Sequence, residues 1–140
     1  MKKRVLILCT GNSARSQIAE ALVNARLGNL WEAFSAGTQP AAQVNPNALA
    51  VLAEVGIETA GSQPKHLNGF VGQRFDVIVT VCDDAAENCP VWPEQGIRLH
   101  IGFSDPAQVT GSAETVLTAF RETREAITVR VLPVLEAISA

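Results

Sequence analysis

The chain has 140 residues, of which 47% are hydrophobic, so we expect a single domain spanning residues 1–140 with one sizeable core. The formal net charge is −3 and no basic run is longer than Lys2-Lys3-Arg4, which excludes the electrostatic footprint of a nucleic-acid-binding protein. No apolar stretch is long enough for a secretion signal or a membrane span, so we expect a cytoplasmic protein with neither nucleic-acid nor membrane partners.

Strand and helix patterns alternate along the chain. Apolar, β-branched runs predict strands at residues 3–9, 31–36, 75–81 and 96–101. Helical spacing predicts helices from Ser16 to about Gly28, from Pro46 to about Gly56, and over 113–138, with a short helix near Leu67 and a loop or short helix over 83–93. Pro133 should kink the last helix or lie near its end. This order predicts an α/β fold with three layers, an open parallel four-stranded sheet with helices on both faces.

Three segments with reactive side chains directly follow predicted strands. They contain Cys9, Cys82 and the Ser104-Asp105-Pro106 turn. Ligands of open parallel sheets bind beyond the carboxyl ends of the strands. We therefore expect the three segments to meet at one edge of the sheet.

The loop after the first strand has the composition of an oxyanion-binding loop. Its small or polar residues separate a cysteine from an arginine at a helix start, in the order Cys9, Thr10, Gly11, Asn12, Ser13, Ala14, Arg15, Ser16. Backbone N–H groups in such a loop bind a tetrahedral anion, and an arginine grips two of its oxygens. The same positive field should lower the pKa of Cys9, and Ser16 should donate a hydrogen bond to its sulfur. The alternative is a buried strand-end thiol.

The other two cysteines lie close together in the sequence. Six residues separate Cys82 from Cys89, and an odd total of three cysteines indicates reactive or buried thiols rather than a disulfide framework. The pair lacks the spacing of a zinc site, and His66 and His100 are isolated, so we expect no metal site. From the residues alone, the pair fits either two structural thiols or a redox relay.

The segment 5–20, VLILCTGNSARSQIAE, resembles the catalytic loop of the low-molecular-weight tyrosine phosphatases and, more closely, of the thioredoxin-coupled arsenate reductases. The likeness extends to Ser35-Ala36-Gly37, Asn45-Pro46, Val79-Thr80-Val81-Cys82-Asp83, Asn88-Cys89-Pro90 and Gly102-Phe103-Ser104-Asp105-Pro106. It implies that Cys9 attacks arsenate, that Cys82 attacks Cys9 and releases arsenite, and that Cys89 then forms a disulfide with Cys82. It also implies an external reductant, thioredoxin or another thiol donor, with no bound cofactor.

The chemistry of arsenic favours reduction over phosphate hydrolysis. Phosphate and sulfate fit the same loop as arsenate, but only arsenic in a sulfur adduct accepts two electrons when a second thiol attacks. The phosphatases that the chain resembles also wall their substrate slot with aromatic side chains, whereas this chain has no tyrosine and has Ala107 after the Asp-Pro pair.

The resemblance assigns supporting roles to further residues. Asp105 corresponds to the general acid, although an aspartate before proline also simply forms turns. Asn12 corresponds to a loop asparagine with a left-handed backbone that braces neighbouring turns. Glu20 and Ser35 correspond to ligands of a potassium site found in some arsenate reductases, but Lys65 stands where an acidic ligand would be, so we expect Lys65 to pair with Glu20 in place of potassium.

Two other functions remain open on the sequence. The first is a phosphatase that uses Cys9, Arg15 and Asp105, with the remaining cysteines protective. The second is an oxyanion-binding or redox-sensing module without turnover. The electron donor also stays open, because glutathione, mycothiol and thioredoxin systems all serve related scaffolds.

Overall fold

Four parallel strands form one sheet in the computed structural model, which describes residues 2–82 and 96–139. The strands are β1 (Lys3–Cys9), β2 (Trp31–Gly37), β3 (Val77–Thr80) and β4 (Ile97–His100), in the spatial order β2-β1-β3-β4. Leu8 pairs with Ala36 on one side and Thr80 on the other, and Thr80 pairs with His100. The carboxyl ends of all four strands therefore lie at the same edge of the sheet, as predicted.

The two inner strands are mostly built from residues that have no contact with solvent. The side chains over 5–8 in β1 and 77–79 in β3 are fully buried. Continuous aliphatic runs of this kind are typical of parallel strands covered on both faces. These strands fix the positions of Cys9, which ends β1, and of Cys82, which follows β3 at the same edge.

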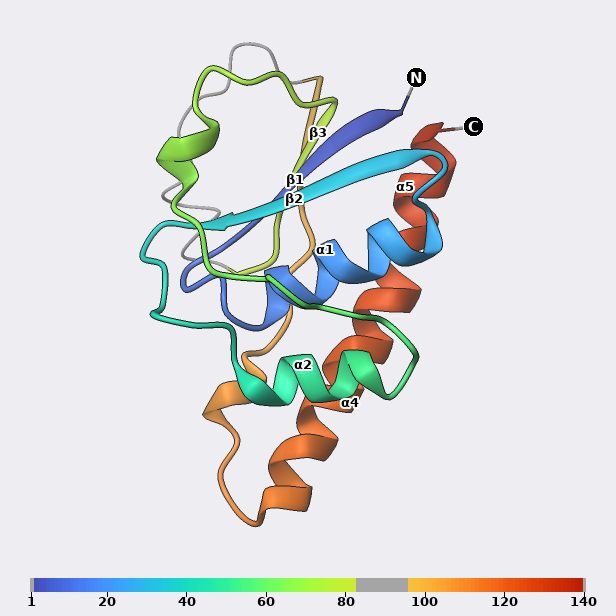
Figure 1. The fold of residues 1–140 in the computed structure, drawn as a ribbon. Coiled ribbons are helices and arrows are strands. Elements are labelled where there is room, and N and C mark those ends of the chain that lie inside the picture. Colours follow the sequence, from blue (N-terminus) through green and yellow to red (C-terminus); the bar gives the residue numbers. More distant parts are fainter. Residues whose placement is uncertain (1, 83–95, 140) are drawn as a thin grey trace.

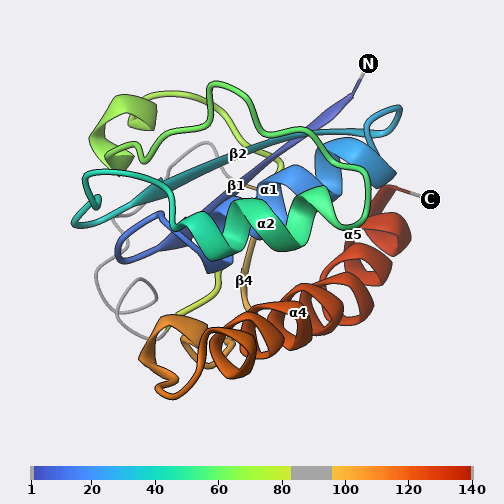
Figure 2. The same cartoon turned by 60° about the horizontal axis from the view of Figure 1, so that its bottom comes forward.

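The described α-helices gather on one side of the sheet in both views (Figures 1 and 2). They are α1 (Arg15–Arg26), α2 (Pro46–Ala53), α4 (Ala113–Arg130) and α5 (Leu132–Ser139). Two of them begin at conventional caps, because the side chains of Asn45 and Ser112 accept hydrogen bonds from the backbone N–H of Asn47 and Thr115. Two short 3-10 helices, η1 (Leu67–Phe70) and η2 (Pro106–Gln108), lie in the connecting segments.

Strand β2 shows what covers each face of the sheet. Trp31 is fully buried against α5 and donates from Nε1 to the carbonyl of Leu135 at 3.1 Å. Phe34 points to the other face, where its ring centroid lies 5.9 Å from that of Phe70 in η1. The predicted fold class is confirmed, and among the described residues the second face is covered by a 3-10 helix rather than an α-helix.

The C-terminal helix is divided where proline requires it. One helix was predicted over 113–138, but α4 ends at Arg130 and α5 begins at Leu132. Proline lacks an N–H and its ring clashes with the preceding turn, so Pro133 fits the first turn of a new helix. None of the helices within residues 2–82 and 96–139 is both long and apolar enough to span a membrane. The prediction for 83–93 lies outside the described residues.

Candidate active site

The site is built around the loop between β1 and α1. Cys9 ends β1 with 3% of its surface exposed, and Arg15 begins α1. Ala14 occupies the N-cap position and has no side chain that could accept a hydrogen bond from the helix. The N–H groups of the first turn of α1 therefore stay available to a bound anion.

The segment that follows β2 holds the backbone of this loop. Its amide groups donate to loop carbonyl oxygens in four hydrogen bonds: Thr38 to Cys9 (3.3 Å), Gln39 to Thr10 (2.9 Å), Ala41 to Gly11 (2.9 Å) and Asn45 to Ser13 (2.8 Å). The peptide bonds of the loop are trans, so the N–H after each carbonyl points to the opposite side. Successive N–H groups of the loop are thus directed away from the anchoring segment, in the arrangement that binds oxyanions.

Gly37 allows the close approach between these two segments. A Cβ at this position would collide with the carbonyl oxygen of Thr10 and would lie 3.1 Å from the backbone nitrogen of Asn12. A glycine at the end of β2 is therefore required by the neighbouring loop rather than by its own backbone angles.

Asn12 braces the loop from inside, as predicted. It is fully buried and has a left-handed backbone with φ of 49°. Its Nδ2 donates to Ser16 Oγ at 2.8 Å, and its Oδ1 accepts from the backbone N–H of Lys65 at 2.9 Å and from Gln17 Nε2 at 3.1 Å. The predicted hydrogen bond from Ser16 to the Cys9 sulfur stays a prediction. Gln17 was missed, because nothing in its position on a helix reveals that its amide also reaches the carbonyl of Gln63 at 3.0 Å.

Arg15 reaches the third segment of the site. Its Nη1 donates to the carbonyl of Phe103 at 3.0 Å, and its Nη2 lies 3.7 Å from Oδ2 of Asp105. Its Nε is buried without a hydrogen-bond partner among the residues that the structure describes. A buried donor without a partner is costly, so this N–H is suited to a ligand oxygen.

Asp105 lies at the start of η2. Its Oδ1 accepts from the backbone N–H of Ala107 at 2.9 Å, which leaves Oδ2 facing Arg15. The turn-forming role and the predicted general-acid role are therefore compatible, because each uses a different oxygen of the carboxylate.

Cys82 lies beside the loop and is 6% exposed. Its sulfur is 3.3 Å from Thr10 Oγ1, and its side chain also hydrogen-bonds with Cys9. The hydrogen bond with Cys82 and the burial of the thiol raise the pKa of Cys9, and the opposing effect of Arg15 is smaller. The expectation that the loop lowers the pKa of Cys9 is therefore wrong for this arrangement, in which the neighbouring thiol stabilises the protonated sulfur.

A partly buried acidic group lies next to the loop on α1. Glu20 Oε1 accepts from Ser35 Oγ at 3.1 Å and lies 3.7 Å from Lys65 Nζ. Burial raises the pKa of Glu20, while Lys65 and Ser35 act in the opposite direction. The predicted pairing of Lys65 with Glu20 is confirmed.

The structure thus brings together Cys9, the loop, Arg15, Cys82 and Asp105 from three segments of the chain. Cys89 lies outside the described residues. Within residues 2–82 and 96–139, no group of three or more histidine, cysteine or acidic side chains could hold a metal ion. His100 is exposed and hydrogen-bonds with Thr80 at 2.8 Å, and His66 caps η1 by accepting from Asn68 at 3.0 Å.

A family of known proteins matches almost the whole chain. Residues 4–139 match the family described as low molecular weight phosphotyrosine protein phosphatase. The chain belongs to this family.

Several similar proteins and solved structures are named arsenate reductases. The chain is 40% identical over 130 residues to an arsenate reductase of Halalkalibacterium halodurans, covering 93% of each chain. Among solved structures, an arsenate reductase in the phosphate binding state superimposes with a TM-score of 0.83 at 28% identity, covering 97% of this chain and 98% of that chain. The thioredoxin-dependent arsenate reductase of Corynebacterium glutamicum superimposes with a TM-score of 0.71 at 27% identity, covering 97% of this chain and 63% of that chain.

Proposed function

We propose that this family member reduces arsenate to arsenite through three cysteines and thereby serves arsenic detoxification. The observation that carries the proposal is the contact between Cys82 and Cys9 at an anion-binding loop. A hydrolase needs one nucleophile at this position, whereas a reductase needs a second thiol within reach of the first. The relatives named arsenate reductase support the same activity.

The first step joins sulfur to arsenic. Arsenate binds to the N–H groups of the loop and to Nε and Nη2 of Arg15. The Cys9 thiol, which the contact with Cys82 keeps protonated, passes its proton to an arsenate oxygen, and its sulfur attacks the arsenic atom. A new S–As bond forms while one As–O bond breaks. The leaving hydroxide takes a proton from Asp105 and departs as water. Arg15 stabilises the negative charge that remains on the arsenic oxygens.

The next two steps move electrons. The Cys82 thiolate attacks the Cys9 sulfur, and the S–As electron pair passes to arsenic, which leaves as arsenite in the +3 state. The resulting Cys9–Cys82 disulfide is attacked by the Cys89 thiolate, which frees Cys9 and leaves a Cys82–Cys89 disulfide. Two thiols have then been oxidised for each arsenic reduced.

The Cys82–Cys89 disulfide has to be reduced before the next cycle. A dithiol protein of the thioredoxin type is the proposed reductant, and the thioredoxin dependence of the Corynebacterium glutamicum relative supports it. We propose a cytoplasmic location, because that compartment keeps resting thiols reduced. Phosphate and sulfate are proposed to occupy the loop as unreactive analogues, and residues 1–140 are proposed to act as one domain without a bound cofactor.

Weak phosphatase activity is expected beside reduction. The family, the anion loop and the contact between Arg15 and Asp105 favour this second activity. A phenyl ring would find little to stack on, because Ala107 follows the Asp-Pro pair and the chain has no tyrosine. Hydrolysis of para-nitrophenyl phosphate should therefore be slow.

The decisive experiment compares two activities in two variants. Arsenate-dependent oxidation of reduced thioredoxin and hydrolysis of para-nitrophenyl phosphate are measured for the wild type, Cys82→Ser and Cys9→Ser. Cys82→Ser should lose thioredoxin oxidation by at least about 100-fold while it retains hydrolysis, because only reduction uses the second thiol. Cys9→Ser should lose both activities.

Two outcomes would contradict the proposal. Unchanged thioredoxin oxidation in Cys82→Ser would remove Cys82 from the relay. Fast phosphate ester hydrolysis by a wild type that does not reduce arsenate would make the chain a phosphatase. Binding of inorganic phosphate to each variant serves as the control for an intact loop.

A further inference from the structure

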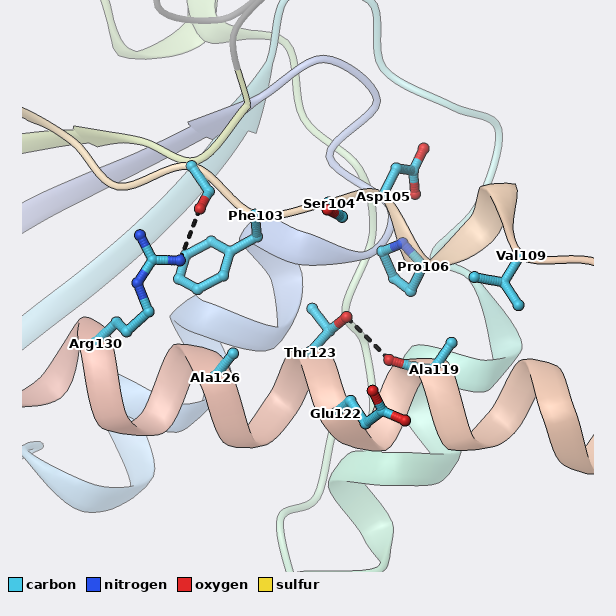
Figure 3. Close-up of a pocket in the computed structure, with 11 residues that line it drawn as sticks. Phe103, Ser104, Asp105, Pro106, Val109, Ala119, Glu122, Thr123, Ala126 and Arg130 are labelled. Carbon is cyan, nitrogen blue, oxygen red and sulfur yellow. Dashed lines mark hydrogen bonds between the residues drawn. The ribbon is translucent and has the colours of Figure 1, made fainter.

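Arg130, the last residue of α4, contacts the loop that follows β4. Its Nη1 donates to the carbonyl of Gly102 at 2.9 Å, and its guanidinium carbon lies 4.6 Å from the centroid of the Phe103 ring. Figure 3 shows both contacts, with the guanidinium beside the ring and the hydrogen bond drawn to the loop backbone. A planar guanidinium over an aromatic face combines a cation–π attraction with directed hydrogen bonds.

The same loop contacts Arg15 and carries Asp105. The carbonyl of Phe103 accepts the hydrogen bond from Arg15 Nη1 at 3.0 Å, and two residues further on Asp105 lies 3.7 Å from Arg15 Nη2. The backbone N–H of Phe103 donates to the carbonyl of Val81, the residue before Cys82, at 3.1 Å. The position of Phe103 therefore determines where Arg15 and Asp105 lie relative to the anion loop.

A hollow lies beside the loop on the side of α4. A hollow of about 450 Å³ separates the segment 102–106 from that helix (Figure 3). Small or polar side chains line the helical wall, among them Ala119, Thr123 and Ala126. The hydroxyl of Thr123 is directed to the carbonyl of Ala119 at 3.0 Å, so it serves its own helix and not the loop. Arg130 spans the hollow at one end and links its two walls.

We infer that Arg130 is a positioning residue for the oxyanion site. It fixes the carbonyl of Gly102 and the ring of Phe103, Phe103 fixes Arg15, and Arg15 then presents Nε and Nη2 to the anion. The part of this inference that concerns arsenate turnover rests on the proposed function. The part that concerns anion binding does not, because it requires only the loop and Arg15.

A purely structural role for Arg130 makes a different prediction. A cation at the C-terminal end of a helix stabilises the helix dipole, and loss of that effect would lower stability without changing the anion site. Arg130 is exposed, so its replacement creates no cavity in the core. Stability and anion affinity can therefore be separated by experiment.

The test uses inorganic phosphate as the probe and three variants. Arg130→Met removes the charge and the donors but retains an apolar stem, and Arg130→Lys retains the charge without the planar fork. Arg121→Met is the matched control. It removes an arginine from the same helix, but Arg121 contacts Glu54 and Glu114 rather than the loop. Phosphate affinity is measured by calorimetry at low and high salt, together with the melting temperature and kcat/KM for arsenate.

Arg130→Met should weaken phosphate binding by about tenfold and lower kcat/KM for arsenate by at least as much, because sub-ångström misplacement of a binding group is costly. Arg130→Lys should recover part of the loss. Arg121→Met should change phosphate affinity less than twofold. The loss in Arg130→Met should persist at high salt, where a long-range effect of the missing charge is screened.

A double-mutant cycle with Phe103→Leu tests the route through the ring. If Arg130 acts through Phe103, the double variant should bind phosphate with about the affinity of the weaker-binding single variant. The losses of binding free energy in the two single variants should not add. The inference is overturned if Arg130→Met binds phosphate like Arg121→Met, or if the two losses add fully. A wild type that binds phosphate but does not reduce arsenate would instead disprove the proposed function and leave this test intact.

Discussion

Arg15 and Asp105 face each other across the mouth of the anion loop, with Nη2 and Oδ2 separated by 3.7 Å. The third nitrogen of the same guanidinium, Nε, is buried and has no partner within the described residues. A tetrahedral anion that binds in the usual forked manner needs both Nε and Nη2. Asp105 therefore competes with the anion for Nη2, and binding requires the carboxylate to move or to be protonated.

This competition predicts opposite effects of one substitution on binding and on turnover. Asp105→Asn removes the competing charge but keeps an acceptor for the N–H of Ala107. Phosphate should bind about fivefold more tightly, as expected for the loss of one partly exposed charge contact. Turnover of arsenate should fall by about 100-fold or more, because the leaving hydroxide loses its acid. Calorimetry and steady-state kinetics measure the two effects.

Asp76→Asn is a suitable control for Asp105→Asn. Asp76 accepts from the backbone N–H of Arg4 at 2.8 Å, at the opposite end of the sheet from the active site. Asp76→Asn should leave phosphate affinity unchanged. Weaker phosphate binding in Asp105→Asn would show that the carboxylate supports the anion site instead of competing for it.

The contact between the two thiols predicts a change in the reactivity of Cys9. The hydrogen bond with Cys82 is the largest cause that raises the pKa of Cys9, so its removal in Cys82→Ala should lower that pKa. More Cys9 is then ionised at neutral pH, and alkylation of Cys9 by iodoacetamide should be faster than in the wild type. Mass spectrometry of the labelled peptide, from pH 6 to pH 9, measures the rate.

Cys89→Ala provides the matched control for this experiment. It removes a thiol from the proposed relay while the contact between Cys82 and Cys9 stays in place. Its Cys9 should react at the wild-type rate. Equal rates in all three proteins would mean that Cys82 does not hold the proton on Cys9.

Thr10 should assist the second step of the relay. Its hydroxyl lies 3.3 Å from the Cys82 sulfur and is placed to orient it toward Cys9. Thr10→Val keeps the shape and removes the hydroxyl, so arsenate reduction should fall by about fivefold to tenfold, equivalent to the net contribution of one hydrogen bond between neutral groups. Thr10→Ser should restore most of the activity, and phosphate affinity should change little in either variant. A loss shared equally by Val and Ser would instead indicate altered packing.

The ion pair of Glu20 and Lys65 predicts a pH-dependent loss of stability. Burial raises the pKa of Glu20 in the folded state, and Lys65 counteracts this, so Lys65→Met should raise the pKa further. A raised folded pKa makes ionised Glu20 unfavourable for folding. The free energy of unfolding should therefore fall by about 1–2 kcal/mol at neutral pH, a modest value because the pair is partly exposed, and should match the wild type near pH 4.

Potassium distinguishes this explanation from a general effect of the substitution. Wild-type activity should not respond to added potassium, since Lys65 Nζ lies 3.7 Å from the carboxylate of Glu20. Lys65→Met should be stabilised by potassium, and Glu20→Gln combined with Lys65→Met should lose both the stability defect and the potassium effect. A sharp rise in wild-type activity on adding potassium would contradict the assignment.

Much of the fold follows from local patterns in the sequence. The predicted strand over residues 3–9 is confirmed, because an aliphatic run between a charged start and a glycine-containing loop has few other conformations. The predicted helix that opens at Asn45-Pro46 is likewise confirmed, since both residues favour a helix start. Strand β3 is shorter than predicted, and Phe75 lies before it, buried against the rings of Phe34 and Phe70. Its apolar character, which predicted a strand residue, serves this aromatic cluster instead.

The site was predictable to the extent that it depends on residue type. Cys9, Arg15 and Asp105 could be found because their chemistry restricts the residues that serve it, and their positions after strands place them together. The contacts of Arg130 with Gly102 and of Gln17 with Gln63 could not, because they join a side chain to backbone atoms at long sequence distance. The raised pKa of Cys9 was missed because it depends on the exact placement of Cys82.

The anchoring of the loop through main-chain carbonyls has an evolutionary consequence. The donors at 38, 39, 41 and 45 are peptide amides, and Gln39 and Ala41 expose their side chains to solvent. Those two exposed positions should therefore tolerate every amino acid except proline. Proline is excluded because it lacks the backbone N–H that donates to the loop carbonyl. Comparison of orthologues would then show high sequence variability at positions 39 and 41 beside an invariant anion loop. Low sequence similarity in this stretch is therefore no sign of lost catalysis.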